Sequence, residues 1–341
     1  MSVLSVVCTA LGDPGKGASL PRLETQLLER IKLKSDQVRI RVASSSVNFA
    51  DVLQLRGLYQ EKLEPPFVPG KEVSGEVIEV GEKVTQFSPG SFVVAVCSSG
   101  AFAEECVAPA SSCFPLPRGV DVREASAIPI AFGTAHLALV ERAKLRPGQV
   151  VLVLGAGGGV GLAAVQIAKL LGARVVAVAR GGTKGKAVKQ FGADHWIDSE
   201  TEGINLQVEV KKAAPAGVDV LFDTVGGQAT HESIRCLRWG AQVLLIGFAS
   251  GNIPSIAANI ALVKNITLHG VYWGMYLSKA PEVVRESLRE VLAWAAEGRL
   301  RVPICRSFPL EDARLALGVL HSREAVGKVI LRPSVEMQPR L

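Results

Sequence analysis

The sequence predicts an α/β protein that combines a β-rich domain with a domain built on a doubly wound parallel sheet. Short apolar segments separated by turn residues fill residues 38–117, as in compact antiparallel β domains. From about residue 122 apolar residues recur at helical spacing, and apolar strands then alternate with helices. With 341 residues, 48% of them hydrophobic, the chain is long enough for two or three domains.

The expected strands of the β-rich domain are bounded by turn signals. Apolar and polar residues alternate over residues 37–42, and a second apolar strand is expected over residues 73–80, ending at Gly81. The turn sequence Ser-Pro-Gly-Ser over 88–91 precedes another strand over 92–96. This punctuation favours short antiparallel strands.

The second domain opens with helical spacing over residues 124–127 and 134–143, and the turn Arg-Pro-Gly over 146–148 leads into its first strand. Later apolar segments predict further strands at 175–179, 196–198, 218–223, 242–247 and 266–271. Helices between them would cover both faces of one parallel sheet.

The C-terminal part contains an amphipathic helix over residues 282–297, a stop at Gly298 and a last strand over 327–332 that we expect to return to the first domain. The chain shows no internal repeat and no long linker. The expected parts are a first domain over 1–120, a second over 121–272 and a returning segment over 273–341.

The most informative segment runs from the apolar strand 150–154 through the glycine-rich loop 155–161 into a helix over 162–171. This order is typical of a dinucleotide-binding unit, in which a helix N-terminus holds a pyrophosphate and glycines allow close approach. In the G-x-G-x-x-G frame an alanine stands at the first glycine position. The candidate cofactor residues of this loop are Ala156, Gly158, Gly159, Val160 and Gly161. The alternative is a tight strand-to-helix turn that binds no ligand.

Composition and sequence pattern argue against nucleic-acid binding, disulfide bonds, a targeting segment and a membrane span. The net charge of +6 is scattered, only 5% of residues are aromatic, and no basic–aromatic pattern indicates a nucleic-acid module. The six cysteines form no C-x-x-C pair, so reduced thiols are expected. The first 20 residues lack a secretory or transit pattern, and the apolar region 150–178 is too interrupted to cross a membrane. We therefore expect a cytoplasmic protein without membrane contact.

Nine short strings carry a family resemblance: residues 47–51, 56–59, 66–72, 133–135, 158–161, 223–227, 262–265, 272–274 and 327–329. In order and spacing they resemble the medium-chain dehydrogenase/reductase superfamily, most closely its zinc-free, quinone-oxidoreductase-like branch. The resemblance covers nearly the whole chain. It implies a GroES-like catalytic domain, formed by both chain ends, and a central Rossmann domain, commonly in homodimers.

The same resemblance argues against a zinc site. Zinc-containing members of the superfamily bind the metal at positions that here hold Asn48, Lys71 and, in a less certain alignment, Ser126. An amide, an ammonium and a hydroxyl do not make a tetrahedral site of the usual sulfur and imidazole type. The cluster of four cysteines that holds a structural zinc is also absent from the sequence.

The cofactor implied is NADPH. An acidic residue that binds the adenosine ribose in NAD-preferring relatives is replaced by Ala179, and the cations Arg180 and Lys184 follow. Missing acid and added cations favour a 2′-phosphate. The alternative for this segment is a solvated charged loop. Ser199 stands near the place where many relatives carry a tyrosine, and Arg180 is expected to compensate.

The resemblance also implies roles for the residues around the nicotinamide ring. Asn48 and Tyr59 would line the acceptor pocket, Thr134 would contact the nicotinamide ribose or carboxamide, and the loop with Gly247 and Phe248 would approach the ring. Lys71 would stabilise an enolate or hydroquinone anion; the alternatives are that it faces solvent or pairs with Glu72.

Three functions remain open at this point. The first is metal-free, NADPH-dependent reduction of a quinone or similar conjugated carbonyl. The second is reduction of an alkenal or enoyl-thioester double bond. The third is NADPH binding without turnover, in a structural or RNA-associated protein.

Overall fold

The computed structural model describes residues 1–12 and 21–334, so part of the N-terminal segment searched for targeting patterns lies outside the described residues. The chain divides into two compact units. The unit that the family resemblance implies to be catalytic, called the catalytic unit below, comprises residues 1–129, 292–297 and 304–341. The Rossmann unit comprises residues 130–291 and 298–303. This division differs from the sequence boundaries at 120 and 272. The helix Val122–Ala125 contacts the strands Gln37–Val47 and Glu72–Val80 and belongs to the catalytic unit, whereas residues 273–291 belong to the Rossmann unit.

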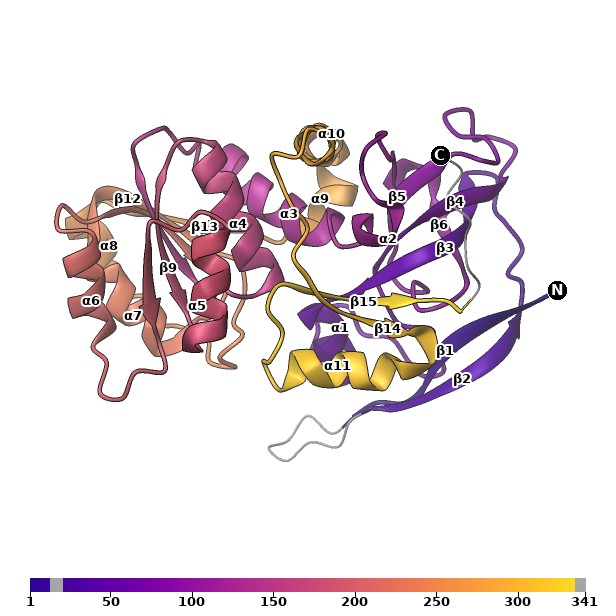
Figure 1. Ribbon diagram of the computed structural model, residues 1–341, viewed down its shortest axis with the longest axis horizontal. Helices are drawn as coiled ribbons and strands as arrows, with labels where there is room; N and C mark the ends of the chain where they lie inside the picture. The colour runs from indigo at the N-terminus through magenta and orange to yellow at the C-terminus, as the bar shows by residue number, and fades with distance from the viewer. Residues whose placement is uncertain (13–20, 335–341) are drawn as a thin grey trace. The chain divides into compact units, whose positions relative to one another are not determined.

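The catalytic unit contains two antiparallel-rich sheets (Figure 1). The smaller pairs β1 (Ser2–Ala10) with β2 (Arg22–Glu29). The larger has the order β14-β15-β3-β4-β5-β7, with β6 paired to β3. Its strands are β3 (Gln37–Val47), β4 (Glu72–Val80), β5 (Phe92–Val96), β6 (Glu105–Pro109), β7 (Cys113–Pro115), β14 (Ile304–Pro309) and β15 (Lys328–Arg332). The helices of this unit are α1 (Phe49–Leu55), α2 (Val122–Ala125) and α11 (Ala313–His321).

The C-terminal strand is central to this sheet. β15 pairs antiparallel with β3, with Val329 opposite Val47 and Leu331 opposite Ser45. Val329 and Leu331 are buried in the same apolar core as Ile40 of β3. The expected return of the tail to the first domain is thereby confirmed, and the sheet order places the end of β3 between the starts of β4 and β15.

The Rossmann unit is a parallel sheet of six strands in the order β10-β9-β8-β11-β12-β13. The strands are β8 (Val150–Leu154), β9 (Arg174–Ala179), β10 (His195–Asp198), β11 (Val218–Asp223), β12 (Leu237–Leu245) and β13 (Thr267–Gly270). Because the strand order reverses between β8 and β11, ligands are expected at the carboxyl ends of these strands.

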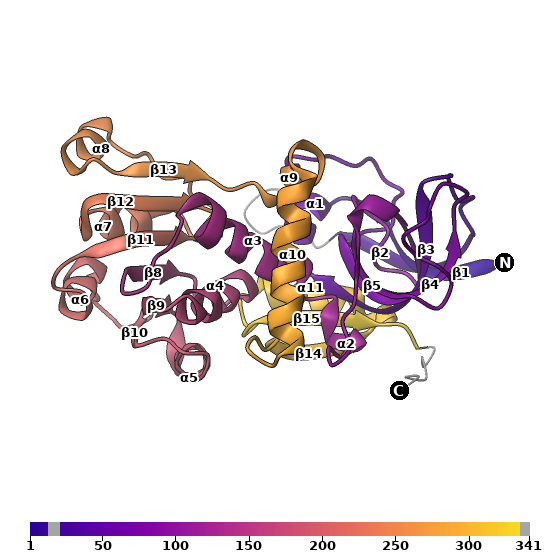
Figure 2. The same cartoon turned by 90° about the horizontal axis from the view of Figure 1, so that it is seen from above.

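Helices cover both faces of this sheet, as Figures 1 and 2 show. One face carries α4 (Gly159–Leu170) and α5 (Gly181–Gln190), and the other carries α6 (Leu206–Ala213), α7 (Gly227–Ile234) and α8 (Ala258–Lys264). The unit also contains α3 (Pro129–His136), a π-helical segment (Leu137–Arg142), α9 (Trp273–Lys279) and most of α10 (Pro281–Ala296). The predicted fold class is confirmed.

Three local predictions differ from the structure. The helix expected from residue 162 begins at Gly159, so loop glycines form its first turn. The segment after Arg180, for which a charged loop was an alternative, is the start of α5. The helix expected over 134–143 changes to π geometry at Leu137. All six cysteines are free, and among the described residues no helix is long and apolar enough to cross a membrane.

Candidate functional site

The glycine loop joins β8 to α4 with little spare room. A Cβ on Gly161 would lie 2.3 Å from the carbonyl oxygen of Gly155 and 2.7 Å from Cα of Ala156. Only glycine allows this close passage of helix against strand end. Ala156 itself is buried, and its N–H donates to Val178 O at 3.0 Å. The loop therefore accommodates an alanine at the first glycine position of the G-x-G-x-x-G pattern.

The start of α4 is suited to an anion. Gly158 is the N-cap residue, and Gly159, Val160 and Gly161 form the first turn. The first N–H groups of a helix have no partner within that helix, and the helix dipole is positive at this end. The loop predicted to hold a pyrophosphate therefore has the backbone arrangement that such a group requires.

Lys184 lies directly against the glycine loop. A Cβ on Gly157 would lie 2.7 to 2.9 Å from Cδ, Cβ and Cγ of Lys184. The aliphatic part of this half-buried lysine thus covers Gly157, and α5 fixes it there. The geometry brings Lys184 and the expected pyrophosphate loop together.

The two other residues expected near the adenosine lie at the ends of neighbouring strands. Arg180 follows β9 and is the N-cap residue of α5. Ser199 follows β10, is exposed, and its N–H donates to Ala179 O at 3.2 Å. Because β9 and β10 pair with Asp198 opposite Ala179, both candidates belong to one strand edge.

Two of the residues expected near the nicotinamide, Gly247 and Phe248, lie beside the turn after β11. Asp223 accepts hydrogen bonds from the N–H groups of Val225 and Gly226 at 2.8 and 2.9 Å, which fixes the turn after β11. Gly247 follows β12, and its N–H donates to Asp223 O at 3.3 Å. Phe248 is partly exposed and lies over this turn, since a Cβ on Gly226 would lie 2.9 Å from its ring.

Thr134 is held by the packing of α3 against α9. It is buried, and the preceding Gly133 lies against the indole of Trp273, where a Cβ would be 2.9 Å from Nε1. His136, at the end of α3, is a packed histidine: its ring nitrogens lie 2.9 Å from Ser287 Oγ and from Glu290 Oε2. Burial is the main cause that lowers the pKa of His136.

The catalytic unit contains a buried polar cluster formed by Asn48, Asp51, Glu72 and Lys328. Lys328 Nζ donates to Asn48 Oδ1 at 2.7 Å and to Glu72 Oε1 at 3.1 Å. Asn48 Nδ2 donates to Glu72 Oε1 at 2.8 Å, and the Asn48 N–H donates to Asp51 Oδ2 at 2.7 Å. Adjacent strand ends create the cluster, because Asn48 follows β3 while Glu72 and Lys328 begin β4 and β15.

Asp51 is a fully buried carboxyl in this cluster. Burial raises its pKa to about 7, against the lowering effects of the Asn48 N–H and of the cations Lys71 and Lys328. Its second carboxylate oxygen, Oδ1, has no hydrogen-bond partner among the described residues.

Lys71 lies beside the cluster and is also buried. Its ammonium donates to Glu61 Oε2 at 3.1 Å and to Ser98 O at 3.0 Å. The same ammonium lies 5.1 Å from the centre of the Tyr59 ring, within the range of a cation–π contact. The structure thus brings together two of the expected acceptor residues, Lys71 and Tyr59, and adds Glu61, which the sequence did not single out.

The positions that hold zinc in relatives carry a donor set unsuited to that metal. Asn48 and Lys71 are bound as described above, and Ser126 Oγ accepts a hydrogen bond of 2.7 Å from Ser44. Among the described residues no group of three or more His, Cys, Asp or Glu could hold a metal ion. The residues present do not fit zinc.

The nearby cysteines are poor nucleophiles. Cys97 and Cys106 have sulfur atoms 3.8 Å apart in the core. The hydrogen bond between the two thiols, together with burial, raises the pKa of Cys97, and burial raises the pKa of Cys113 to about 12. Thiols of this kind remain protonated at neutral pH.

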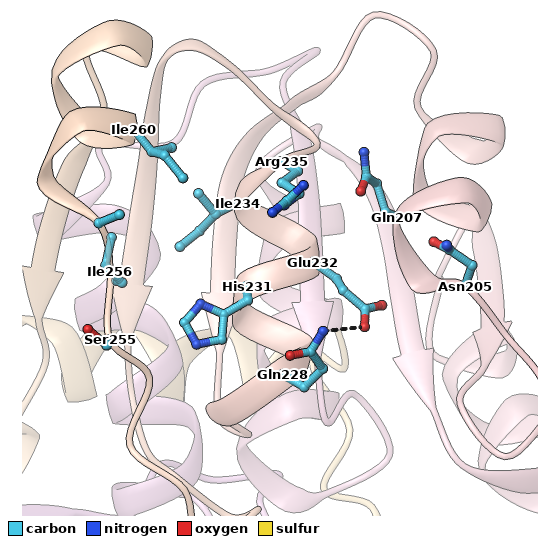
Figure 3. Close-up of a pocket in the computed structure, with 11 residues that line it drawn as sticks. Asn205, Gln207, Gln228, His231, Glu232, Ile234, Arg235, Ser255, Ile256 and Ile260 are labelled. Carbon is cyan, nitrogen blue, oxygen red and sulfur yellow. Dashed lines mark hydrogen bonds between the residues drawn. The ribbon is translucent and has the colours of Figure 1, made fainter.

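A pocket of about 530 Å³ lies elsewhere in the Rossmann unit, on the outer face of α7. His231 and Glu232 of α7 and Arg235 just after it are among its lining residues (Figure 3), and Gln228 Nε2 donates to Glu232 Oε1 at 3.0 Å. None of the expected site residues lines it. We assign it no role in the site.

Lys328 is the residue that sequence reasoning missed. The string Gly327-Lys-Val329 marked its segment, but nothing in the sequence pairs it with Asn48, 280 positions away. The signal is a charged residue at the start of an apolar strand, which is informative only when the register of β15 against β3 is known.

Comparisons with known proteins agree with this architecture. The family model of the alcohol dehydrogenase GroES-like domain matches residues 34–118, and that of the zinc-binding dehydrogenase matches residues 159–297. The quinone oxidoreductase-like protein 2 homolog of Nematostella vectensis is 39% identical over 97% of this chain and 89% of its own length.

Solved structures give the same result. A probable oxidoreductase from Mycobacterium abscessus superposes with a TM-score of 0.86 at 32% identity, covering 98% of this chain and 99% of its own. A mycobacterial protein determined in complex with NADPH has a TM-score of 0.87 at 29% identity, covering 97% and 100%. The chain therefore belongs to the quinone oxidoreductase-like family of the medium-chain dehydrogenase/reductase superfamily, as its sequence strings indicated.

Proposed function

We propose that this protein is a zinc-independent, NADPH-dependent reductase that transfers hydride to a quinone or a similar conjugated carbonyl. The observation that carries the proposal is the donor set at the superfamily's zinc positions, where Asn48, Lys71 and Ser126 are bound to protein groups. Without a Lewis acid to polarise an alcohol or a simple carbonyl, an acceptor that is already electrophilic is the better match. Quinones and α,β-unsaturated carbonyls meet that requirement.

The Rossmann unit supplies the residues for the cofactor, and NADPH supplies the hydride when it is bound. The loop residues 158–161 would bind the pyrophosphate through backbone N–H groups. Arg180 and Lys184 would pair with the 2′-phosphate, with Ser199 beside them. The NADPH complex of a relative with 29% identity supports this assignment.

The residues at the nicotinamide end of the cofactor would be held in position by packing within the Rossmann unit. Thr134 would contact the ribose or carboxamide, and the loop of Gly247 and Phe248 would approach the ring. Both are held by neighbouring structure, Thr134 through the contact of Gly133 with Trp273 and Gly247 through its bond to Asp223. Such fixed positions favour hydride transfer, which depends mainly on orientation and exclusion of water.

Asn48, Tyr59 and Lys71 would act on the acceptor oxygen. An ammonium held in place stabilises the negative charge that develops there as hydride arrives at the conjugated system. Glu61 and Ser98 hold Lys71 from two directions, so little reorganisation is required. Tyr59 would offer its hydroxyl and its ring.

The test measures NADPH oxidation by the chelator-treated protein with ortho-quinones, para-quinones, alkenals and enoyl-CoA, and repeats it with NADH. We expect chelator-resistant turnover with quinones, at least tenfold lower in Lys71→Met and unchanged in the matched surface variant Lys83→Met. Turnover confined to alkenals or enoyl-CoA would replace the quinone assignment. NADPH binding without turnover by any acceptor would show a non-catalytic protein, and faster reaction with NADH would contradict the cofactor assignment.

We also propose a homodimer formed through the β13 side of the Rossmann unit. None of the α8 residues is buried, and Leu262 and Val263 are 80% and 76% exposed. β13 is an edge strand, and its Leu268 is also exposed. Unpaired edges and adjacent apolar side chains are usually covered. Light scattering should give the mass of a dimer that Leu262→Glu dissociates; the control Leu315→Glu, an exposed leucine on α11, should leave it intact.

The remaining assignments are proposals from the sequence. They are a small-molecule acceptor as the partner, a cytoplasmic location, and no binding to membranes or nucleic acid. The turnover assay above tests the acceptor, fractionation of cells tests the location, and binding of the purified protein to anionic vesicles and RNA tests the third assignment.

A further inference from the structure

A carboxylate lies beside the arginine assigned to the 2′-phosphate. Glu200 follows β10, and its Oε1 lies 3.8 Å from Nη1 of Arg180. Its second oxygen, Oε2, lies 2.9 Å from the place of a Cβ on Gly181. Glu200 therefore extends over the first residue of α5, where the adenosine end of the cofactor is expected.

The position of Glu200 is fixed by its backbone. Asp198 Oδ1 accepts hydrogen bonds from the N–H of Gly181 at 2.8 Å and from the N–H of Glu200 at 2.9 Å. One carboxylate oxygen thus ties the turn after β10 to the start of α5. Trp196 strengthens the connection, because its Nε1 donates to Ala179 O at 3.2 Å and its ring lies against Gly185.

This arrangement places a carboxylate near the end of β9, where the sequence lacks the acidic residue of NAD-preferring folds. In dinucleotide-binding folds that prefer NAD, the carboxylate at the end of the second strand binds the ribose 2′-hydroxyl, while arginine favours the 2′-phosphate. Here β9 ends in Ala179 and Arg180 follows it, but Glu200 brings a carboxylate to the same place from the next strand.

We propose that Glu200 is a specificity-determining residue that limits the preference for NADPH over NADH by competing with the 2′-phosphate for Arg180. The inference rests on the proposed function. The side chains of Arg180 and Glu200 are 39% and 56% exposed, so the pair opens at little cost. With NADH, the Glu200 carboxylate accepts a hydrogen bond from the ribose hydroxyl; with NADPH, it must leave Arg180 and stay near a second anion.

The expected effect follows from Coulomb's law in water. A phosphate of about −1.5 to −2 charges about 5 Å from a carboxylate at physiological ionic strength is disfavoured by about three- to fivefold in affinity. Removing the charge of Glu200 should recover that factor for NADPH. NADH carries no 2′-phosphate, so its affinity should change by less than about twofold, because a glutamine side chain still offers a carbonyl acceptor.

The experiment measures dissociation constants for NADPH and NADH, without acceptor, from the quenching of protein fluorescence. Glu200→Gln should raise the ratio of NADPH to NADH affinity by about three- to fivefold, and by more at low salt. The control Glu202→Gln makes the same change of net charge at an exposed position and should leave the ratio unchanged.

Each result has a separate meaning. A ratio in Glu200→Gln equal to that of the control would refute the inference and leave the proposed function intact. A fall in NADPH affinity in Glu200→Gln would show that the carboxylate positions Arg180 for the phosphate, which is also contrary to the inference. Absence of NADPH binding in the parent protein would overturn the proposed function itself.

Discussion

Replacing Lys328 by methionine should destabilise the catalytic unit strongly. Lys328 is 4% exposed and Glu72 is fully buried, and their charged atoms lie 3.1 Å apart. Methionine fills much of the same space but leaves the Glu72 carboxylate without its ammonium. Breaking a buried ion pair on one side costs about 3–5 kcal/mol, a large part of the total stability of about 5–15 kcal/mol typical of a domain.

The double variant Lys328→Met/Glu72→Gln separates charge from packing. It removes both charges, and the amide oxygen introduced at position 72 can still accept from Asn48 Nδ2. Replacing a whole buried pair by neutral groups is often close to neutral in stability. We therefore expect the double variant to regain more than half of the loss, although its cluster lacks the hydrogen bonds that Lys328 Nζ donates to Asn48 Oδ1 and to Glu72 Oε1.

The assay is thermal and urea unfolding followed by circular dichroism, with Lys83→Met as a surface control. A loss of about 3–5 kcal/mol in a unit of this size lowers Tm by about 6–20 °C. If Lys328→Met lost less than about 1 kcal/mol, or if the double variant were as unstable as the single, the ion pair would not be the stabilising feature.

Two further predictions follow from the site. Gly161→Ala should lower the free energy of unfolding by about 1–3 kcal/mol, because the added Cβ meets backbone atoms. Gly157→Ala should instead weaken NADPH binding about tenfold with little loss of stability, because the added Cβ displaces only the Lys184 side chain. Equal unfolding curves for the two variants would contradict this. Asp51 has a pKa of about 7 in the folded state and of about 4 in the unfolded state. Between these pH values the folded state binds more protons than the unfolded state. Its free energy of unfolding therefore falls as pH rises from about 4 to about 7, by up to about 4 kcal/mol. In Asp51→Asn this component should be absent, and parallel pH profiles of the two proteins in urea unfolding would refute it.

Much of the fold was predictable because its signals are local. The glycine loop, the apolar strand before it and the helix after it lie in one continuous segment, and each property that identifies them belongs to neighbouring residues. The parallel strands are short apolar runs between turn signals. Boundaries were less exact: β12 begins at Leu237, before the expected strand, because the exposed residues 238–240 show no apolar pattern.

The polar cluster was not predictable for the opposite reason. Asn48, Glu72 and Lys328 meet only through the order β15-β3-β4 and the register of those strands. Neither is encoded in short-range periodicity, since a strand of the same pattern pairs equally well in another order. Ion pairs such as Lys71 with Glu61 depend in addition on the path of a loop, which propensity does not fix.

The three residues proposed to contact the electron acceptor differ in how far their polar groups are already used in hydrogen bonds. Asn48 uses Oδ1 for Lys328 and Nδ2 for Glu72, with Ser46 O a further 3.4 Å neighbour of Nδ2. An acceptor oxygen could bind Asn48 only by weakening a buried bond. Lys71 is different, because Glu61 and Ser98 use two of its three hydrogens. The cluster is therefore better suited to hold the Asn48 loop in place, while charge on the acceptor is met by Lys71 with Tyr59 beside it.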